Sequence, residues 1–383
     1  MAEGQSRGLG PNAKLVGIKN SRRQLSTPSL LLDLDALERN IAAMAAHTKA
    51  AGIKLRPHTK GGKSIQIARR QLAAGAIGLC CSTLGEAEVM AGSGIAGVLI
   101  TSPVVTPAMI ERLTALNGRS SDLMVVVDDP SNVERLAAAA QKAKKLLGVL
   151  VEFDVGQGRT GTTSVGAAVA LARQVKASPH LLFCGVQAYY GHLQHLAGYT
   201  DREKAAATQM ARVRELLAAL EREGLVPRIV TGGGTGTFDI DPEGRVYTEL
   251  QLGSYPFMDR EYMDIPLGAD RPAPFVPALF VQASVISANR EGFAVVNAGL
   301  KAFATEGGMP RVLSPVLGDA QYKFMGDEHG GIAYAPNGEG LKVGDLVEFL
   351  PPHCDPTINL YDRYHCVRGG TLVEIWPVDA RGC

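Results

Sequence analysis

Short apolar runs alternate with amphipathic, alanine-rich segments through the first 270 residues. Candidate strands lie at 53–57, 77–81, 97–101, 122–127, 148–153, 182–187 and 228–231. The clearest helical segments are 131–146, 164–177 and 201–223. Strands that alternate with helices in this way predict βα units and a parallel sheet. Because there are about eight such units, we expect a closed (β/α)₈ barrel rather than an open doubly wound sheet.

The first helix is predicted from its boundary signals. An apolar run at 29–33 precedes Asp35 and Glu38, which have the spacing of a capping box. Apolar positions then recur at helical intervals from 37 to 48, and Gly52 ends the pattern. We therefore expect a helix that starts at Asp35 and stops before Gly52.

The pattern changes near residue 270. Pro272, Pro274 and Pro277 interrupt the chain, and glycine-rich turns then separate predicted strands at 279–286, 292–298, 341–350, 364–367 and 371–376. We divide the chain into three parts. Residues 1–26 form a polar extension that partly joins the β-domain, residues 27–270 the barrel, and residues 271–383 a smaller β-rich domain.

Composition narrows the function classes. The chain has 383 residues, is 46% hydrophobic and carries a net charge of +1. This balance, without a Lys/Arg cluster, argues against nucleic-acid binding. No apolar stretch is long enough to span a membrane, and the N-terminus lacks the apolar core of a signal peptide. The six cysteines are scattered, and the adjacent Cys80 and Cys81 look like buried apolar residues. We expect a cytoplasmic protein.

Three glycine-rich segments could bind phosphate. The run 61–64 resembles the end of a P-loop, but Pro57 stands where that loop needs glycine. The run 156–161 matches a dinucleotide fingerprint, yet the following strand at 183–187 lacks the required acidic residue. The run 231–237, Thr-Gly-Gly-Gly-Thr-Gly-Thr, follows a late strand, where barrels commonly hold phosphates. We therefore predict the phosphate site there, although a tight turn is the alternative.

Lys60 follows the strand at 53–57, at the end of the barrel where catalytic groups gather. Arg56, His58 and Lys63 are its neighbours in sequence. If these cations lay beside a partly buried Lys60, its pKa would fall and its amine could form a Schiff base. A solvated loop lysine is the other interpretation, and position alone does not decide between them.

A series of motifs resembles the D-threonine aldolase, 3-hydroxy-D-aspartate aldolase and D-serine dehydratase group. These are fold-type III pyridoxal-phosphate enzymes related to the alanine racemases. The motifs occur in family order over about residues 27–378. They lie at 27–35, 55–60, 151–159, 187–189, 194–195, 231–236, 247–255, 297–301, 327–330 and 352–357.

The resemblance implies a role for particular residues. Lys60 would be the Schiff-base lysine of pyridoxal 5'-phosphate, and His195 would face the substrate hydroxyl. Arg159 would approach the ring oxygen, and Tyr189 would line the ring. The phosphate would be held by Thr235, Gly236, Ser254 and Tyr255. The family's metal ligands fall on His353 and Asp355.

The His353–Asp355 pair also has a physical argument. In a strand, residues i and i+2 point to the same side, so both side chains would share one face. An imidazole and a carboxylate suit Mn²⁺ or Mg²⁺. Without the family, a His–Asp pair that binds no metal is the alternative. His192 and His195 have a spacing that could also hold a metal, but no carboxylate accompanies them.

Three departures from the aldolase pattern bear on the substrate. Gly62 stands where those enzymes usually have histidine, and Tyr190 replaces another common histidine. The run 82–84, Ser-Thr-Leu, looks more like a dehydratase branch.

We expect a metal-dependent lyase that cleaves D-threonine-like D-β-hydroxy-α-amino acids to glycine and an aldehyde. The alternative is a dehydratase of D-serine or D-threo-3-hydroxyaspartate, which gives a 2-keto acid and ammonia. Those relatives tend to carry His-x-Cys and zinc, whereas this chain has Asp355. A non-catalytic pyridoxal-phosphate carrier would resemble the barrel alone. The resemblance also implies a homodimer in which the second subunit's β-domain closes each site.

Overall fold

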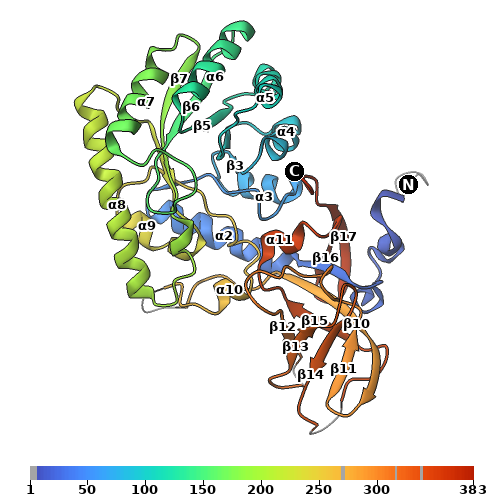
Figure 1. Cartoon of the computed structure of the whole chain (residues 1–383). Coiled ribbons are helices and arrows are strands. Elements are labelled where there is room, and N and C mark those ends of the chain that lie inside the picture. The colour runs from blue at the N-terminus through green and yellow to red at the C-terminus, as the bar shows by residue number, and fades with distance from the viewer. Residues whose placement is uncertain (1–6, 269–271, 315–316, 337–339) are drawn as a thin grey trace.

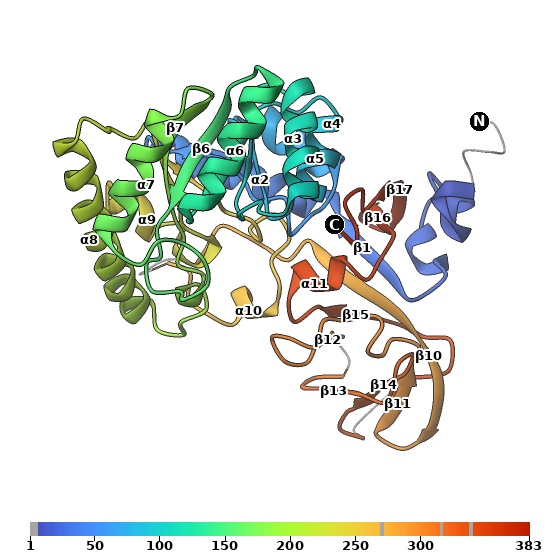
Figure 2. The same ribbon diagram turned by 45° about the horizontal axis from the view of Figure 1, so that its top comes forward.

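The computed structural model describes residues 7–268, 272–314, 317–336 and 340–383. They form a barrel and a second, mostly stranded unit, with the short helices α10 (Arg260–Met263) and α11 (Cys354–Ile358) between the two (Figures 1 and 2). No helix in the described ranges has the length and apolar character needed to cross a membrane.

Eight parallel strands form the barrel in the order β2-β9-β8-β7-β6-β5-β4-β3. A bridge between His58 and Cys80, with a hydrogen bond from Ile77 N–H to Leu55 O (2.9 Å), joins the two ends of this order. The predicted (β/α)₈ barrel is therefore confirmed. Its strands are β2 (Lys54–Leu55), β3 (Leu79–Cys81), β4 (Val98–Ile100), β5 (Met124–Val127), β6 (Leu147–Glu152), β7 (Leu181–Ala188), β8 (Ile229–Gly232) and β9 (Glu249–Leu250).

Helices cover the outside of the barrel (Figure 1). They are α2 (Leu34–Ala50), α3 (Ile65–Ala73), α4 (Leu84–Gly92), α5 (Pro107–Arg119), α6 (Pro130–Ala143), α7 (Val165–Ala177), α8 (Tyr199–Arg222) and α9 (Ile240–Glu243). The capping prediction for α2 was wrong by two residues. Asp33 caps the helix by accepting from the N–H groups of Asp35 (3.0 Å) and Ala36 (3.1 Å). An aspartate that follows a strand directly can end the strand and start the helix at once.

The second unit is a nine-stranded, mainly antiparallel sheet. Its strands are β1 (Ser29–Asp33), β10 (Leu279–Arg290), β11 (Phe293–Val296), β12 (Arg311–Leu313), β13 (Gln321–Phe324), β14 (Gly330–Ala333), β15 (Leu346–Leu350), β16 (Arg363–Arg368) and β17 (Thr371–Pro377). Strand β1, which we had placed in the barrel, pairs instead with β10 and β16. A strand can therefore precede a barrel in sequence and still belong to a distant sheet.

The N-terminal extension joins the same sheet. It contains three short 3₁₀ helices, η1 (Arg7–Leu9), η2 (Pro11–Leu15) and η3 (Ser21–Gln24). Leu15 and Leu25 pack with Leu31 of β1 and with Val367 and Leu372. The described part of the extension thus packs on strands of the β-domain.

A buried charged pair joins the neighbouring strands β2 and β9 of the barrel. Arg56 Nε and Nη2 donate to the Glu249 carboxylate at 2.7 and 3.1 Å, and both side chains are buried. A small apolar cluster that includes Cys80, Leu99 and Met124 forms a separate interior layer. Each of the two charges, Arg56 and Glu249, needs the other, because a buried charge without a partner lowers the stability of the fold.

We expect Arg56→Met to lower the free energy of unfolding by about 3–5 kcal/mol, because it leaves the Glu249 carboxylate buried without its cation. The double variant Arg56→Met/Glu249→Met should regain most of that loss. Urea unfolding of the wild type, both single variants and the double variant measures the effect. A loss below about 1 kcal/mol for Arg56→Met would show that water, not Arg56, compensates the carboxylate.

Candidate active site

A cavity of about 250 Å³ opens at the carboxyl ends of the barrel strands. Most of its lining residues lie in loops that follow a strand, because parallel strands bring these loops to one end of the barrel. The lining residues are His58, Lys60, Ser82, Thr101, Ser102, Arg159, Thr160, Gln187, Tyr189, Gly234, Thr235, Gln251, Gly253, Ser254 and Tyr262.

The loop after β2 carries Lys60 into this cavity. Thr59 anchors the loop, since its N–H and its hydroxyl both donate to Cys80 O, at 2.8 and 3.0 Å. The Lys60 ammonium forms an ion pair with Asp355 of α11. The charge of Asp355 raises the pKa of Lys60 above its ordinary value, against the effect of burial.

The expected cause of lysine activation was wrong. Arg56 is bound to Glu249, and Lys63 Nζ donates to Glu86 at 2.9 Å. Burial, with help from the Lys60 charge, lowers the pKa of His58 to about 3, so this imidazole is neutral. The neighbouring cations are therefore compensated or uncharged, and a carboxylate is the group that sets the charge of Lys60.

Arg159 and Tyr189 lie on one wall of the cavity. The guanidinium carbon of Arg159 stands 5.8 Å from the centroid of the Tyr189 ring. His58 follows β2 and Thr101 follows β4. His58 Nε2 lies 3.1 Å from Thr101 Oγ1, and this hydrogen bond fixes the plane of the imidazole. Arg159 and Tyr189, which the resemblance assigns to the cofactor ring, thus line the cavity that Lys60 enters.

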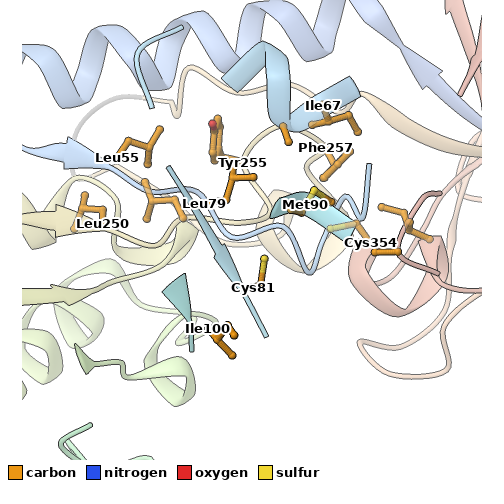
Figure 3. Packing of buried hydrophobic residues seen from close by; sticks show 14 of the residues in the cluster. Leu55, Ile67, Leu79, Cys81, Met90, Ile100, Leu250, Tyr255, Phe257 and Cys354 are labelled. Atoms are coloured by element: carbon orange, nitrogen blue, oxygen red, sulfur yellow. The ribbon is translucent and has the colours of Figure 1, made fainter. Parts of the chain in front are cut away.

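The predicted phosphate residues divide into two pairs. Thr235 and Ser254 line the cavity, and Ser254 N–H donates to Thr235 Oγ1 at 3.2 Å. Gly236 and Tyr255 do not line it: Gly236 N–H donates to Gln194 Oε1 at 2.9 Å. The Tyr255 hydroxyl accepts from Gln71 Nε2 at 2.9 Å, and its ring lies among core residues such as Leu55 and Leu79 (Figure 3).

The predicted metal pair lies beside the cavity, but on a helix start and not on a strand. His353 precedes α11 and Asp355 is the second residue of α11. The premise that both share one face of a strand was therefore wrong. Burial would raise the pKa of Asp355, but the Lys60 ammonium and His353 outweigh it and hold that pKa below its usual range.

Two carboxylates that the sequence analysis did not single out lie near His353. Asp259, Glu261 and His353 each offer one ligand atom, and these atoms lie within 4.8 Å of one another. Glu261 Oε2 is 3.6 Å from His353 Nδ1 and 3.9 Å from His195 Nε2. His353 Nδ1 is buried and has no hydrogen-bond partner within the described ranges. An imidazole with two carboxylates suits a divalent cation.

His195 lies at this end of the site. Its ring packs on Tyr262 with a centroid distance of 4.5 Å, and Tyr262 lines the cavity. Burial and the nearby His353 lower the pKa of His195 to about 4. The imidazole is therefore neutral near pH 7 and can accept a proton.

The chain is similar to known proteins over most of its length. Residues 32–261 match the N-terminal domain of alanine racemase, and residues 278–367 match the putative serine dehydratase domain. A 3-hydroxy-D-aspartate aldolase of Paracoccus denitrificans (strain Pd 1222) is 42% identical over 363 residues, which are 94% of this chain and 93% of the relative. The chain belongs to the alanine racemase-like family.

Two further relatives agree with this family assignment. A D-threonine aldolase of Arthrobacter sp is 40% identical over 366 residues, with 94% of this chain and 93% of the relative covered. The crystal structure of D-threonine aldolase from Filomicrobium marinum has a TM-score of 0.91 and 39% identity, and covers 94% of this chain and 97% of that chain. The resemblance seen in the motifs is confirmed, and the two-unit architecture is that of the family.

The departures from the aldolase pattern now have local explanations. A Cβ atom at Gly62 would lie 2.9 Å from the Phe257 ring, so a histidine would need Phe257 to move. Tyr190 is fully buried and its hydroxyl donates to Asp241, outside the cavity. Ser82 does line the cavity, and its N–H donates to Glu86 at 2.7 Å. Of the three, only position 82 can contact a ligand in the cavity.

Proposed function

We propose that this protein is a lyase that cleaves D-β-hydroxy-α-amino acids to glycine and an aldehyde, with pyridoxal 5'-phosphate on Lys60 and a divalent metal at His353 and Asp355. One observation carries the proposal: Lys60 from the barrel meets Asp355 and its neighbour His353 from the β-domain at the mouth of one cavity. An amine for the cofactor and ligands for a metal are thus within reach of one small substrate.

The cavity fits pyridoxal phosphate. Lys60 supplies an amine, Arg159 and Tyr189 form a wall for the ring, and the hydroxyls of Thr235 and Ser254 lie at the glycine-rich end for the phosphate. A Cβ atom at Gly234 would collide with the Gln194 side chain, so glycine is needed for Gln194 to pack against this loop. Pyridoxal phosphate, when bound, supplies an electron sink for the carbon that loses a substituent.

The metal residues fit a hard divalent ion, for which we propose Mn²⁺ or Mg²⁺. The partnerless Nδ1 of His353 faces carboxylate oxygens, and oxygen-rich ligand sets favour these ions. A bound divalent ion lowers the pKa of a hydroxyl that it coordinates.

Residues of the chain itself would carry out the proton transfer and position the cofactor ring. Neutral His195 accepts the proton of the substrate's β-hydroxyl, directly or through water. That oxygen's electrons form the C=O bond of the aldehyde as the Cα–Cβ bond breaks, and Cα gains a proton to give glycine. Arg159 and Tyr189 would border the cofactor ring during this step, and Asp355 would hold the metal together with His353.

Dehydration is the second candidate, and Cys354 bears on it. Its thiol is fully buried, burial raises its pKa well above the usual range, and its Sγ lies 3.3 Å from Asp355 Oδ1. The position two residues after His353, where the dehydratase relatives carry cysteine, is Asp355 in this chain, so Cys354 does not stand at the relatives' zinc-ligand position. Ser82 in the cavity is the feature that favours dehydration.

The proposal includes three further points. The barrel binds the cofactor and the β-domain carries the metal residues, with β1 counted in the β-domain. The enzyme acts as a homodimer whose partner closes each site. It works in the cytoplasm on small amino acids.

Products decide between the two reactions. With D-threonine and Mn²⁺ we expect equimolar glycine and acetaldehyde. We expect L-threonine to be cleaved at less than about 1% of the rate of D-threonine, because a site built on one face of the cofactor discriminates strongly between the two enantiomers. Chromatography of the amino acids and a coupled aldehyde assay measure both. A 2-keto acid with ammonia as main products would refute the aldolase assignment and leave the family and the cofactor site standing.

A further inference from the structure

The segment that contains α10 runs alongside the segment that precedes α11. Arg260 N–H donates to Pro351 O at 3.0 Å, and Glu261 N–H donates to Pro352 O at 3.3 Å. α10 follows the last barrel strand, whereas residues 351–353 follow β15 of the β-domain. These backbone hydrogen bonds place Glu261 of one unit opposite His353 of the other.

Asp259 fixes this contact through both of its carboxylate oxygens. Its Oδ1 accepts from Tyr262 N–H at 3.2 Å, and its Oδ2 accepts from Cys354 N–H at 2.8 Å. It is completely buried, and both of its oxygens hold backbone amides, one in each unit. Asp259 is therefore a positioning residue that sets the distance between the two segments.

Glu261 has the geometry of a ligand. Its Oε2 lies 3.6 Å from the partnerless Nδ1 of His353, and its side chain is 21% exposed. Gly307 packs against the Glu261 side chain and has a φ of +79°. A Cβ atom at position 307 would lie 2.9 Å from Glu261 Cδ, so glycine is needed for this contact. Within the described ranges, the other carboxylate that forms an ion pair with His353 Nδ1 is Glu306, which is slightly farther away at 3.8 Å and has a side chain that is 75% exposed. A half-buried carboxylate and an imidazole nitrogen that has no hydrogen-bond partner among the described residues leave room at this separation for a cation between them.

We propose that Glu261 is a further protein ligand of the divalent metal, beside His353, so that the ion joins the barrel to the β-domain. This inference rests on the metal in the proposed function. The metal site is then shared by the two units, and removal of the ion loosens the contact between α10 and residues 351–353.

Mn²⁺ titration of metal-stripped protein that keeps its cofactor tests the ligand. Free Mn²⁺ is measured by electron paramagnetic resonance for the wild type, Glu261→Gln, Glu261→Asp and the matched control Glu306→Gln. We expect Glu261→Gln to weaken Mn²⁺ affinity about 10–100-fold. Glu261→Asp should fall between it and the wild type, because it keeps the charge but shortens the reach. Glu306→Gln removes the same charge from an exposed position and should change affinity less than about 3-fold.

Saturating Mn²⁺ should also raise the melting temperature of the wild type more than that of Glu261→Gln, since a ligand that binds only the folded state stabilises it in proportion to its affinity. Equal Mn²⁺ affinity in Glu261→Gln and the wild type, or equal losses in Glu261→Gln and Glu306→Gln, would overturn the inference. Wild-type protein that binds no Mn²⁺ would overturn both the ligand and the metal site. Keto-acid products with normal Mn²⁺ binding would refute the aldolase function alone.

Discussion

Lys60→Ala is expected to abolish the covalent attachment of pyridoxal phosphate and to lower turnover by at least about 10³-fold. Among the residues that line the cavity, Lys60 supplies the primary amine; His58 is a neutral imidazole and Arg159 a guanidinium. Borohydride reduction followed by peptide mass spectrometry should therefore place the cofactor mass on Lys60 in the wild type. The variant should show no such adduct.

Lys60→Arg is the matched control for this experiment. Arginine keeps a cation beside Asp355 but cannot form the link, so it separates the ion pair from the covalent chemistry. We expect Lys60→Arg to retain wild-type thermal stability and yet lose the adduct and the activity. A reduced adduct on Lys63 would contradict the assignment, although Lys63 is buried and held by Glu86 and by the carbonyl oxygens of Ala380 and Cys383.

The barrel could be predicted because its signals are local. Each strand from β2 to β8 overlaps an apolar run, and helices α6, α7 and α8 match their predicted segments within a few residues. The assignment of β1 failed for the opposite reason. Its partners, β10 and β16, lie more than 240 positions away in sequence by the register Ser29–Gln282, and no local pattern specifies such pairing.

The candidate site was predictable only to the level of loops. A residue that follows a barrel strand must lie at the catalytic end, which is why Lys60, Arg159, Tyr189 and Thr235 line one cavity. Topology does not tell which way a side chain points. Tyr255 follows Ser254 directly, yet its ring turns into the core (Figure 3).

The prediction of which charged groups lie beside Lys60 was wrong, because it relied on neighbours in sequence. Lys60 has Arg56 and Lys63 as sequence neighbours, but both are bound to glutamates from other elements, Glu249 and Glu86. The group that faces Lys60 is Asp355, 295 positions away. Glu261 escaped notice likewise, because a carboxylate on a short polar segment carries no local mark of a metal site.

Removal of the metal should stop cleavage and leave the bound cofactor in place. We expect chelation, and separately His353→Ala, to lower turnover with D-threonine on the order of 10²–10³-fold, because the substrate hydroxyl then loses the ion that lowers its pKa. The visible absorption of the cofactor should persist, since the residues proposed to hold its phosphate and its ring, Thr235 and Arg159, come from the barrel. Added Mn²⁺ should restore the chelated wild type but not His353→Ala.

His353 is a cleaner target than Asp355 for this test. Asp355 also forms the ion pair with Lys60, so its loss would disturb the amine as well as the metal. His192→Ala is the matched control: His192 is exposed and belongs to the alternative His192–His195 pair, and its loss should leave Mn²⁺-dependent activity within about 3-fold of the wild type. Should His192→Ala lose activity while His353→Ala keeps it, the metal would belong to the loop after β7. Full activity of the chelated wild-type protein would instead show that the reaction needs no metal and that His195 accepts the proton without help from an ion.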